Sequence, residues 1–116
     1  MSNIKLMGVD LAKNVFQVCA LDEENQVVFN KKLKRNQLVE FMSKQIVSPV
    51  YMEACYSSHY WARRFNQMGH RSFLIPAQHV TPFVRGNKND HNDALAIAEC
   101  SKRPSLRFVP IKTERQ

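Results

Sequence analysis

The chain has 116 residues, 44% of them hydrophobic, and its 17 lysines and arginines outnumber 10 acidic residues to give a net charge of +7. This length fits one domain with one core and excludes a protein with two. The positive charge favours a polyanionic partner, either nucleic acid or an anionic membrane surface, although many small basic domains have no such partner.

The apolar stretches of the sequence are too short, or too interrupted by charge, for a membrane protein or a secreted protein. The first run contains Lys5 and Asp10, unlike a signal peptide. No stretch approaches the roughly 20 apolar residues of a membrane span. We therefore expect a cytoplasmic protein with no membrane association.

The cysteines are widely spaced, odd in number and without a C-x-x-C pair: Cys19, Cys55 and Cys100. This pattern predicts reduced, buried thiols rather than disulfides or a zinc site. Cys55 and His59 stand four residues apart, as a metal-binding pair on a helix would. No second pair completes that site, so a core cysteine beside a surface histidine is favoured.

In chain order, the residues predict three strands, at 3–11, 15–22 and 27–33, with the third at a sheet edge. A helix over 35–46 follows, with Asn36 as its N-cap. Further elements alternate between strand and helix: a strand at 48–54, a helix at 57–69 capped by Ser57 or Ser58, and a strand at 70–77. The connection 78–89 is predicted to carry one helical turn after Thr81, before a helix over 90–103 and a short strand within 104–111.

The order β-β-β-α-β-α-β-α differs from that of a doubly wound sheet. It predicts an α/β protein with the ribonuclease-H-like fold, a mixed five-stranded sheet with flanking helices. The two later helix–strand units are expected to be right-handed crossovers, and the fourth strand is expected to run parallel to the first.

Four carboxylates are expected to converge at one edge of this sheet. Asp10 ends the first strand and Glu53 ends the fourth, while Asp90 and Asp93 share one face of the last helix. Each aspartate has a local alternative: Asp10 suits a turn, Asp90 an N-cap, and Asp93 the positive end of the helix. Glu53 has no capping role, which favours a functional one.

Like charges about 4 Å apart repel by about 4 kcal/mol at an effective dielectric of 20, so such a cluster needs cations. Oxygen ligands suit Mg²⁺ or Mn²⁺. Two such ions about 3.5–4 Å apart activate a water and stabilise the leaving oxygen of a phosphodiester. The four carboxylates are therefore candidates for both metal binding and catalysis.

Three segments carry a family resemblance over nearly the whole chain: "MGVDLAKNVFQVCALD" (7–22), "VYMEACYSSHYWARRF" (50–65) and "VRGNKNDHNDALAIAE" (84–99). They closely resemble the N-terminal domain of the DEDD transposases, which comprise the insertion-sequence one-ten family and the related Piv-type invertases. In that family the domain is similar to RuvC, the Holliday-junction resolvase, and its D-E-D-D residues hold divalent metal. The matching positions are Asp10, Glu53, Asp90 and Asp93.

The resemblance implies DNA cleavage and strand transfer during transposition or site-specific inversion. Family members also carry a C-terminal domain with a nucleophilic serine, and some are guided by a structured RNA. The chain is thus expected to be one catalytic domain over 1–116, the N-terminal part of a longer, homo-oligomeric transposase, and to be inactive if that second domain is missing.

Several other residues are candidates for contact with nucleic acid. Lys13, Arg85, Lys88 and His91 are candidates, each with a solvated side chain as its alternative. The basic run 30–35 is either a DNA-facing patch or a solvated edge. In the helix at 57–69, Arg63 and Arg64 are expected to face solvent. Its aromatic residues are expected to lie in the core rather than to stack on bases: Tyr60, Trp61 and Phe65.

Two other functions remain open. A sugar-kinase or actin-type ATPase shares the fold, but its phosphate hairpin needs a glycine and a small hydroxyl residue where this chain has Leu11, Ala12 and Lys13. A non-catalytic module for nucleic-acid binding or assembly on the same fold is the second alternative. Binding of metal and of ATP distinguishes these functions.

Overall fold

The structure, a computed structural model, describes residues 4–11, 14–80, 90–102 and 107–113, and for 90–93 it describes the backbone alone. Its five strands are β1 (Ile4–Leu11), β2 (Val15–Asp22), β3 (Val27–Lys34), β4 (Pro49–Glu53) and β5 (Arg71–Ile75). Its helices are α1 (Arg35–Ser43), α2 (Ser58–Gln67), α3 (Ala77–Val80) and α4 (Asp90–Cys100). Within the described ranges, no helix has the length and apolar character needed to cross a membrane.

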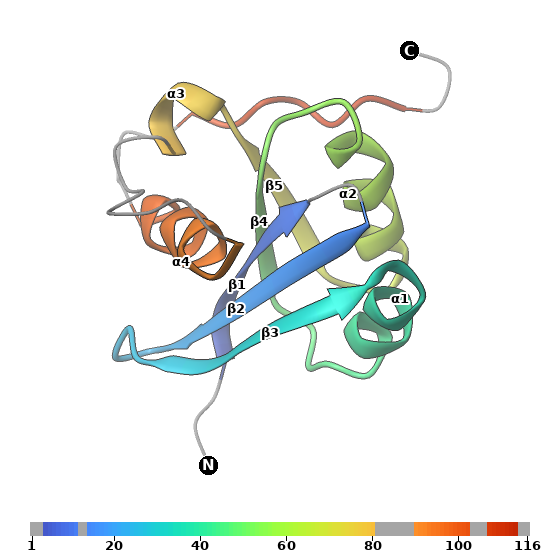
Figure 1. Cartoon of the computed structure of the whole chain (residues 1–116). Helices are drawn as coiled ribbons and strands as arrows, with labels where there is room; N and C mark the ends of the chain where they lie inside the picture. Colours follow the sequence, from blue (N-terminus) through green and yellow to red (C-terminus); the bar gives the residue numbers. More distant parts are fainter. Residues whose placement is uncertain (1–3, 12–13, 81–89, 103–106, 114–116) are drawn as a thin grey trace.

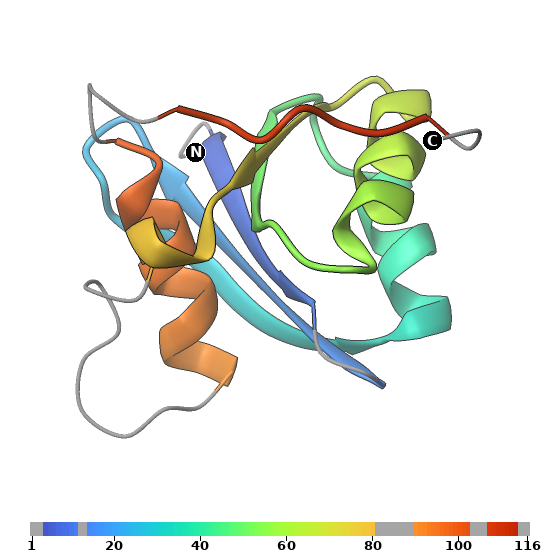
Figure 2. The same cartoon turned by 90° about the horizontal axis from the view of Figure 1, so that it is seen from above.

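One sheet carries the strands in the order β3-β2-β1-β4-β5. The first three form an antiparallel meander, whereas β4 runs parallel to β1 and β5 parallel to β4. Helices α1 and α2 cover one face and α4 covers the other (Figures 1 and 2). The predicted mixed sheet, with its parallel first and fourth strands and its third strand at an edge, is confirmed.

The face under α1 and α2 holds the larger core. Trp61 and Phe65 are one helical turn apart on α2, and the Trp61 ring meets Phe16 of β2 edge-on with centroids 5.3 Å apart. Buried His70 ties this layer to the loop before β4. Its Nδ1 accepts from the Ser48 N–H at 3.1 Å, so its Nε2 carries the proton and donates to the Met42 carbonyl at 2.8 Å.

Local predictions failed where one element runs straight into the next. Asn36 is not the N-cap of α1, because β3 continues directly into the helix and Lys34 takes that position. Gln37 accepts a hydrogen bond from the Lys34 N–H at 2.9 Å instead. The helical turn predicted for the connection 78–89 lies instead at Ala77–Val80, just after β5. Thr81, the predicted cap of that turn, is outside the described residues.

The predicted strand within 104–111 is largely wrong. The described part of that segment makes one isolated antiparallel bridge, in which the Val109 N–H donates to the Leu74 carbonyl at 2.8 Å. Its apolar residues pack on the sheet without a ladder of hydrogen bonds: Phe108 lies 5.0 Å from the Phe73 ring. The apolar residues of this segment therefore contact the sheet without pairing as a strand.

Candidate functional site

Asp10 and Glu53 lie at the same level on neighbouring parallel strands. The β1–β4 register pairs Val9 with Met52, and each carboxylate is the next residue along its strand. Both side chains are half-buried. Because parallel neighbours in register point their side chains to the same side of a sheet, the two carboxylates share one face. This is the neighbourhood that the sequence predicted for them.

That face is the one covered by α4. A Cβ on Gly8 would lie 2.6 Å from the Ala94 carbonyl oxygen and 2.8 Å from the Ala98 nitrogen, so α4 packs directly on the backbone of β1. Side chains alternate along a strand, and Asp10 is two residues from Gly8, so it also points to the α4 side. The local alternative, in which Asp10 starts a turn, is disfavoured because Asp10 pairs with Gln17 inside the β1–β2 ladder.

The backbone of α4 brings the second carboxylate pair toward the same edge. Asp90 is the first residue of α4, and Asp93 directly precedes Ala94, whose carbonyl lies against Gly8. Figure 2 shows that α4 begins at the end of the sheet where β1 finishes. The side chains of Asp90 and Asp93 are outside the described residues. Among the side chains that are described, no group of three His, Cys, Asp or Glu could hold a metal.

Gln17 is a residue of this site that was not predicted. It pairs with Asp10 across the β1–β2 ladder, is 4% exposed, and its side-chain nitrogen donates to Asn30 Oδ1 at 2.5 Å. On its other side, Gln17 pairs with Lys32 of β3. One row across four strands therefore runs from Lys32 through Gln17 and Asp10 to Glu53. A glutamine inside the apolar run "VFQVCAL" was the available sequence signal.

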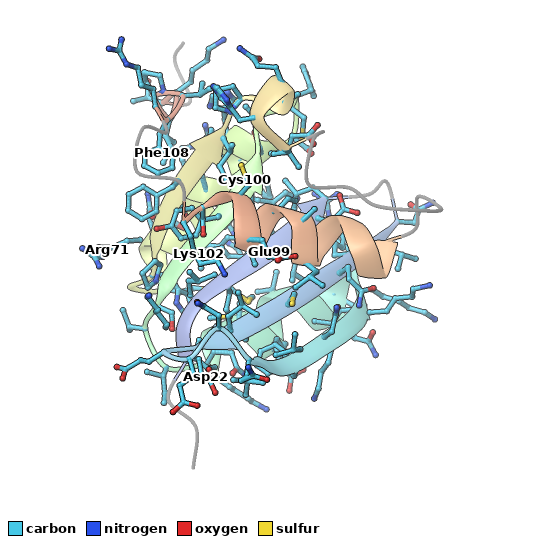
Figure 3. All side chains as sticks on the ribbon, turned by 90° about the vertical axis from the view of Figure 1, so that its left-hand side faces the viewer. Asp22, Arg71, Glu99, Cys100, Lys102 and Phe108 are labelled. Carbon is cyan, nitrogen blue, oxygen red and sulfur yellow. The ribbon has the colours of Figure 1, made fainter. Side chains whose placement is uncertain are left out.

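Cys19 lies on the same face, two residues from Gln17, and packs with Ala94 and Ala98 of α4. Burial first, and then the negative charge of Glu99, raise the pKa of its thiol to about 11. Figure 3 shows Glu99 on α4, next to Cys100, whose thiol donates to the His79 carbonyl at 3.0 Å. Cys19 and Cys100 are buried, as predicted, whereas Cys55 is exposed because β4 ends at Glu53.

These environments predict one fast-reacting thiol. In the native protein at neutral pH, we expect a soluble disulfide reagent to modify Cys55 alone of the three cysteines. Cys19 stays protonated until the pH approaches 11 and is shielded by α4. The measurement is the number of thiols titrated before and after addition of urea. Rapid modification of Cys19 in folded protein would contradict the close packing of α4 on β1.

The other candidates for nucleic-acid contact have mixed outcomes. Lys13, Arg85 and Lys88, and the side chain of His91, lie outside the described residues. Within the basic run 30–35, the lysines and Arg35 are exposed. Their exposure agrees both with a DNA-facing patch and with a solvated edge. These contacts therefore stay predictions.

Helix α2 differs from its prediction at three positions. Arg63 does not simply face solvent, since its Nη1 donates to the Lys112 carbonyl at 2.6 Å, and Arg64 is also half-buried. Tyr60 is 42% exposed and not part of the core. The sheet and the C-terminal segment 107–113, which is bonded to Arg63, lie against other sides of the helix.

His59 holds the same C-terminal segment. Its Nδ1 accepts from the Lys112 N–H at 3.0 Å. Burial, and then the charges of Lys112 and Arg63, lower the pKa of His59. Its ring nitrogen is thus engaged, and Cys55 precedes the helix rather than sharing a face with it. The expected core position of Cys55 is wrong, and no metal pair with His59 is favoured.

The sequence of the chain is similar to those of known transposases. Residues 7–116 match the family model of DEDD transposases of the IS110 type, described as a transposase. The chain is 48% identical over 116 residues to the transposase for insertion sequence element IS1111A of Coxiella burnetii, covering 100% of this chain and 32% of that protein. It is 46% identical over 114 residues to a probable family 20 transposase of Pseudomonas aeruginosa, covering 98% and 34%. The chain thus spans about a third of the length of these curated relatives.

Two solved structures of one protein share this fold with the chain. Thermus thermophilus RuvC aligns with a TM-score of 0.63 at 10% identity, covering 90% of this chain and 99% of that one. T. thermophilus RuvC in complex with a Holliday junction substrate aligns with a TM-score of 0.56 at 10% identity, covering 92% and 100%. The predicted RuvC-like, ribonuclease-H-like fold is confirmed.

Proposed function

Because the chain belongs to the IS110 family of DEDD transposases, we propose that it is the domain that provides the metal-binding carboxylates for DNA cleavage and strand transfer. The observation that carries this proposal is the β1–β4 register, which sets Asp10 and Glu53 side by side on the α4 face. One fold can support many different reactions, so the residues of the site, rather than the fold, determine the function.

The residues present fit a hard divalent cation. Asp10 and Glu53 supply carboxylate oxygens at one sheet edge, and the start of α4 brings Asp90 and Asp93 toward them. Oxygen ligands of this kind suit Mg²⁺ or Mn²⁺, and a site of four carboxylates suits two ions. When bound, such ions lower the pKa of a water and stabilise negative charge on phosphate oxygens.

The protein's own contribution is to hold these ligands in place. The β1–β4 pairing fixes the backbone of Asp10 and Glu53, and the contact of Ala94 with Gly8 fixes the start of α4. Gln17, buried and held by Asn30, pairs with Asp10 across the β1–β2 ladder, where it would shield the carboxylate from bulk water on that side. Lys32, in the same row, supplies a positive charge for a phosphate that approaches the carboxylates.

DNA is the partner that this chemistry fits, and the net charge of +7 supports it. The structural relative T. thermophilus RuvC has been solved in complex with a Holliday junction substrate. We extend the proposal to a homo-oligomeric transposase in which 1–116 is the N-terminal catalytic domain. A structured guide RNA as second partner also remains part of this proposal.

The proposal is tested by metal binding to this chain. At about 100 times the dissociation constant, Mn²⁺ is expected to add about 2.7 kcal/mol of stability, or about 10 °C in melting temperature for a domain of this size. EDTA should reverse the rise, and Asp10→Asn should abolish it. Scanning calorimetry in Mn²⁺, Mg²⁺ or ATP alone provides the comparison.

Each outcome decides between functions. A melting temperature that does not respond to millimolar metal, in a folded domain that still binds DNA, would favour a non-catalytic binding module. Stabilisation by ATP would favour the ATPase alternative. A rise that persists in Asp10→Asn would place the metal elsewhere and overturn the proposed site.

A further inference from the structure

A second feature lies at the end of the sheet where β1 and β4 finish, on the face opposite the carboxylates. Two adjoining cavities, of about 660 and 340 Å³, share Arg35 and Trp61 in their linings, and we call them together the Arg35 groove. The larger cavity lies between Val15 at the start of β2, Lys34 at the end of β3, and Tyr60 of α2. Its volume is in the range of pockets that bind small molecules, about 300–1,000 Å³.

The groove opens at the edge where the carboxylates lie. Leu11, which follows Asp10 at the end of β1, lines the smaller cavity. The groove is also bounded by the first residues of α1 and lies near those of α2, both of which follow strands that end at this edge (Figure 1). A strand of nucleic acid that crosses the edge at Asp10 would therefore enter the groove on leaving it.

The lining combines a flat aromatic surface with positive charge. The guanidinium carbon of Arg35 lies 5.3 Å from the centre of the Trp61 ring and 5.8 Å from that of Tyr60. Trp61 is 2% exposed and forms the wall, whereas Tyr60 is 42% exposed and meets Trp61 edge-on at 5.1 Å. The exposed part of Tyr60 can therefore stack on a planar group.

The charge around the groove is of one sign. No acidic residue is among the described residues that line either cavity. Arg35 lines both cavities, and Lys34 lines the larger one. The first turns of α1 and α2 also lack acidic residues, so the positive ends of both helix dipoles are not offset there. An anionic occupant with a planar, apolar part fits this combination better than an apolar peptide does.

We propose that the Arg35 groove binds an unpaired nucleotide of the DNA strand that passes the carboxylate edge. The base stacks on Tyr60 and contacts the guanidinium of Arg35, and Lys34 neutralises a neighbouring phosphate. The groove would hold the strand next to the position of cleavage. This inference rests on the proposed function for its choice of DNA as the ligand.

The test is binding of a short oligo(dT) to this chain in EDTA, followed by fluorescence anisotropy of the labelled DNA. Tyr60→Ala is expected to weaken binding by about tenfold, the usual loss for one stacked base, and Tyr60→Phe to retain it. Lys34→Ala should lower the salt dependence of binding by about 0.7 in log–log slope, whereas Tyr60→Ala should leave that slope unchanged.

Trp61 provides a direct report from the groove, since it is the sole tryptophan of the chain. Bound DNA should change its fluorescence in wild type and in Tyr60→Phe. Phe108→Ala is the matched control, because Phe108 is 40% exposed, as Tyr60 is 42%, and lies against β4 and β5 away from the groove. This control should bind oligo(dT) as wild type does.

The outcomes separate the groove from the metal site. Unchanged DNA binding by folded Tyr60→Ala, or an equal loss in Phe108→Ala, would overturn the groove while leaving the metal titration intact. Tighter binding of oligo(U), or displacement of the DNA by an acidic peptide, would also overturn the choice of DNA. If Mn²⁺ fails to stabilise the protein but Tyr60 still governs DNA binding, the proposed function fails and the groove stands.

Discussion

Replacing Gly8 with alanine is expected to lower the free energy of unfolding by about 3 kcal/mol, the upper part of the range for overpacked cores. The new Cβ would lie 2.6 Å from the Ala94 carbonyl oxygen and 2.8 Å from the Ala98 nitrogen, and both are backbone atoms of α4. The helix must therefore move as a whole. For a domain of this size, the loss corresponds to about 10 °C in melting temperature, measured by urea and thermal unfolding.

Gly69→Ala is the matched control. Gly69 has a φ of +100°, and a Cβ there would meet the Val47 side chain at 3.2 Å. Its replacement is expected to cost about 1 kcal/mol through backbone strain, and it should leave metal binding unchanged. Gly8→Ala should also weaken metal binding, because the displaced helix carries Asp93. Equal stability of Gly8→Ala and wild type would show that α4 does not pack on β1 as described.

Replacing Glu53 with glutamine is expected to weaken Mn²⁺ binding at least about a hundredfold, since changes to residues that only support a ligand already cost about 10–100-fold. Glutamine keeps the size of the side chain but removes the charge that faces Asp10 across the β1–β4 pairing. The fold should persist, because the last residue of β4 is half-buried rather than part of the core. Isothermal titration calorimetry measures the affinity.

The control for that experiment is Glu40→Gln. Glu40 is exposed on α1, where its carboxylate accepts a hydrogen bond from Lys44 Nζ at 2.9 Å. It has the same chemistry as Glu53 but lies on a helix that covers the other face of the sheet (Figure 2). Its replacement should leave the affinity for Mn²⁺ at the wild-type value. Equal losses in both variants would indicate a diffuse effect of charge rather than a ligand at Glu53.

Much of the architecture could be predicted because it depends on local patterns. The strand ends at Asp22 and Lys34 and the start of α4 at Asp90 agree with their predictions within a residue. Errors arose where burial comes from distant segments. Tyr60 is spaced like a core residue of α2, yet it is exposed at the rim of the Arg35 groove. A strand was predicted within 104–111, yet the described part of that segment makes one isolated bridge.

The five strands of the sheet, their order along the chain and the family could be predicted from the residues alone, since periodicity and motifs depend on near neighbours in the chain. The sequence also marked Asp10 and Glu53 as carboxylates at strand ends. That the two carboxylates share a level and a face is set by the folded sheet, because register depends on hydrogen bonds between segments over forty residues apart. The contact of α4 with Gly8 and the Arg35 groove are likewise set by packing between distant parts of the chain, which no local pattern encodes.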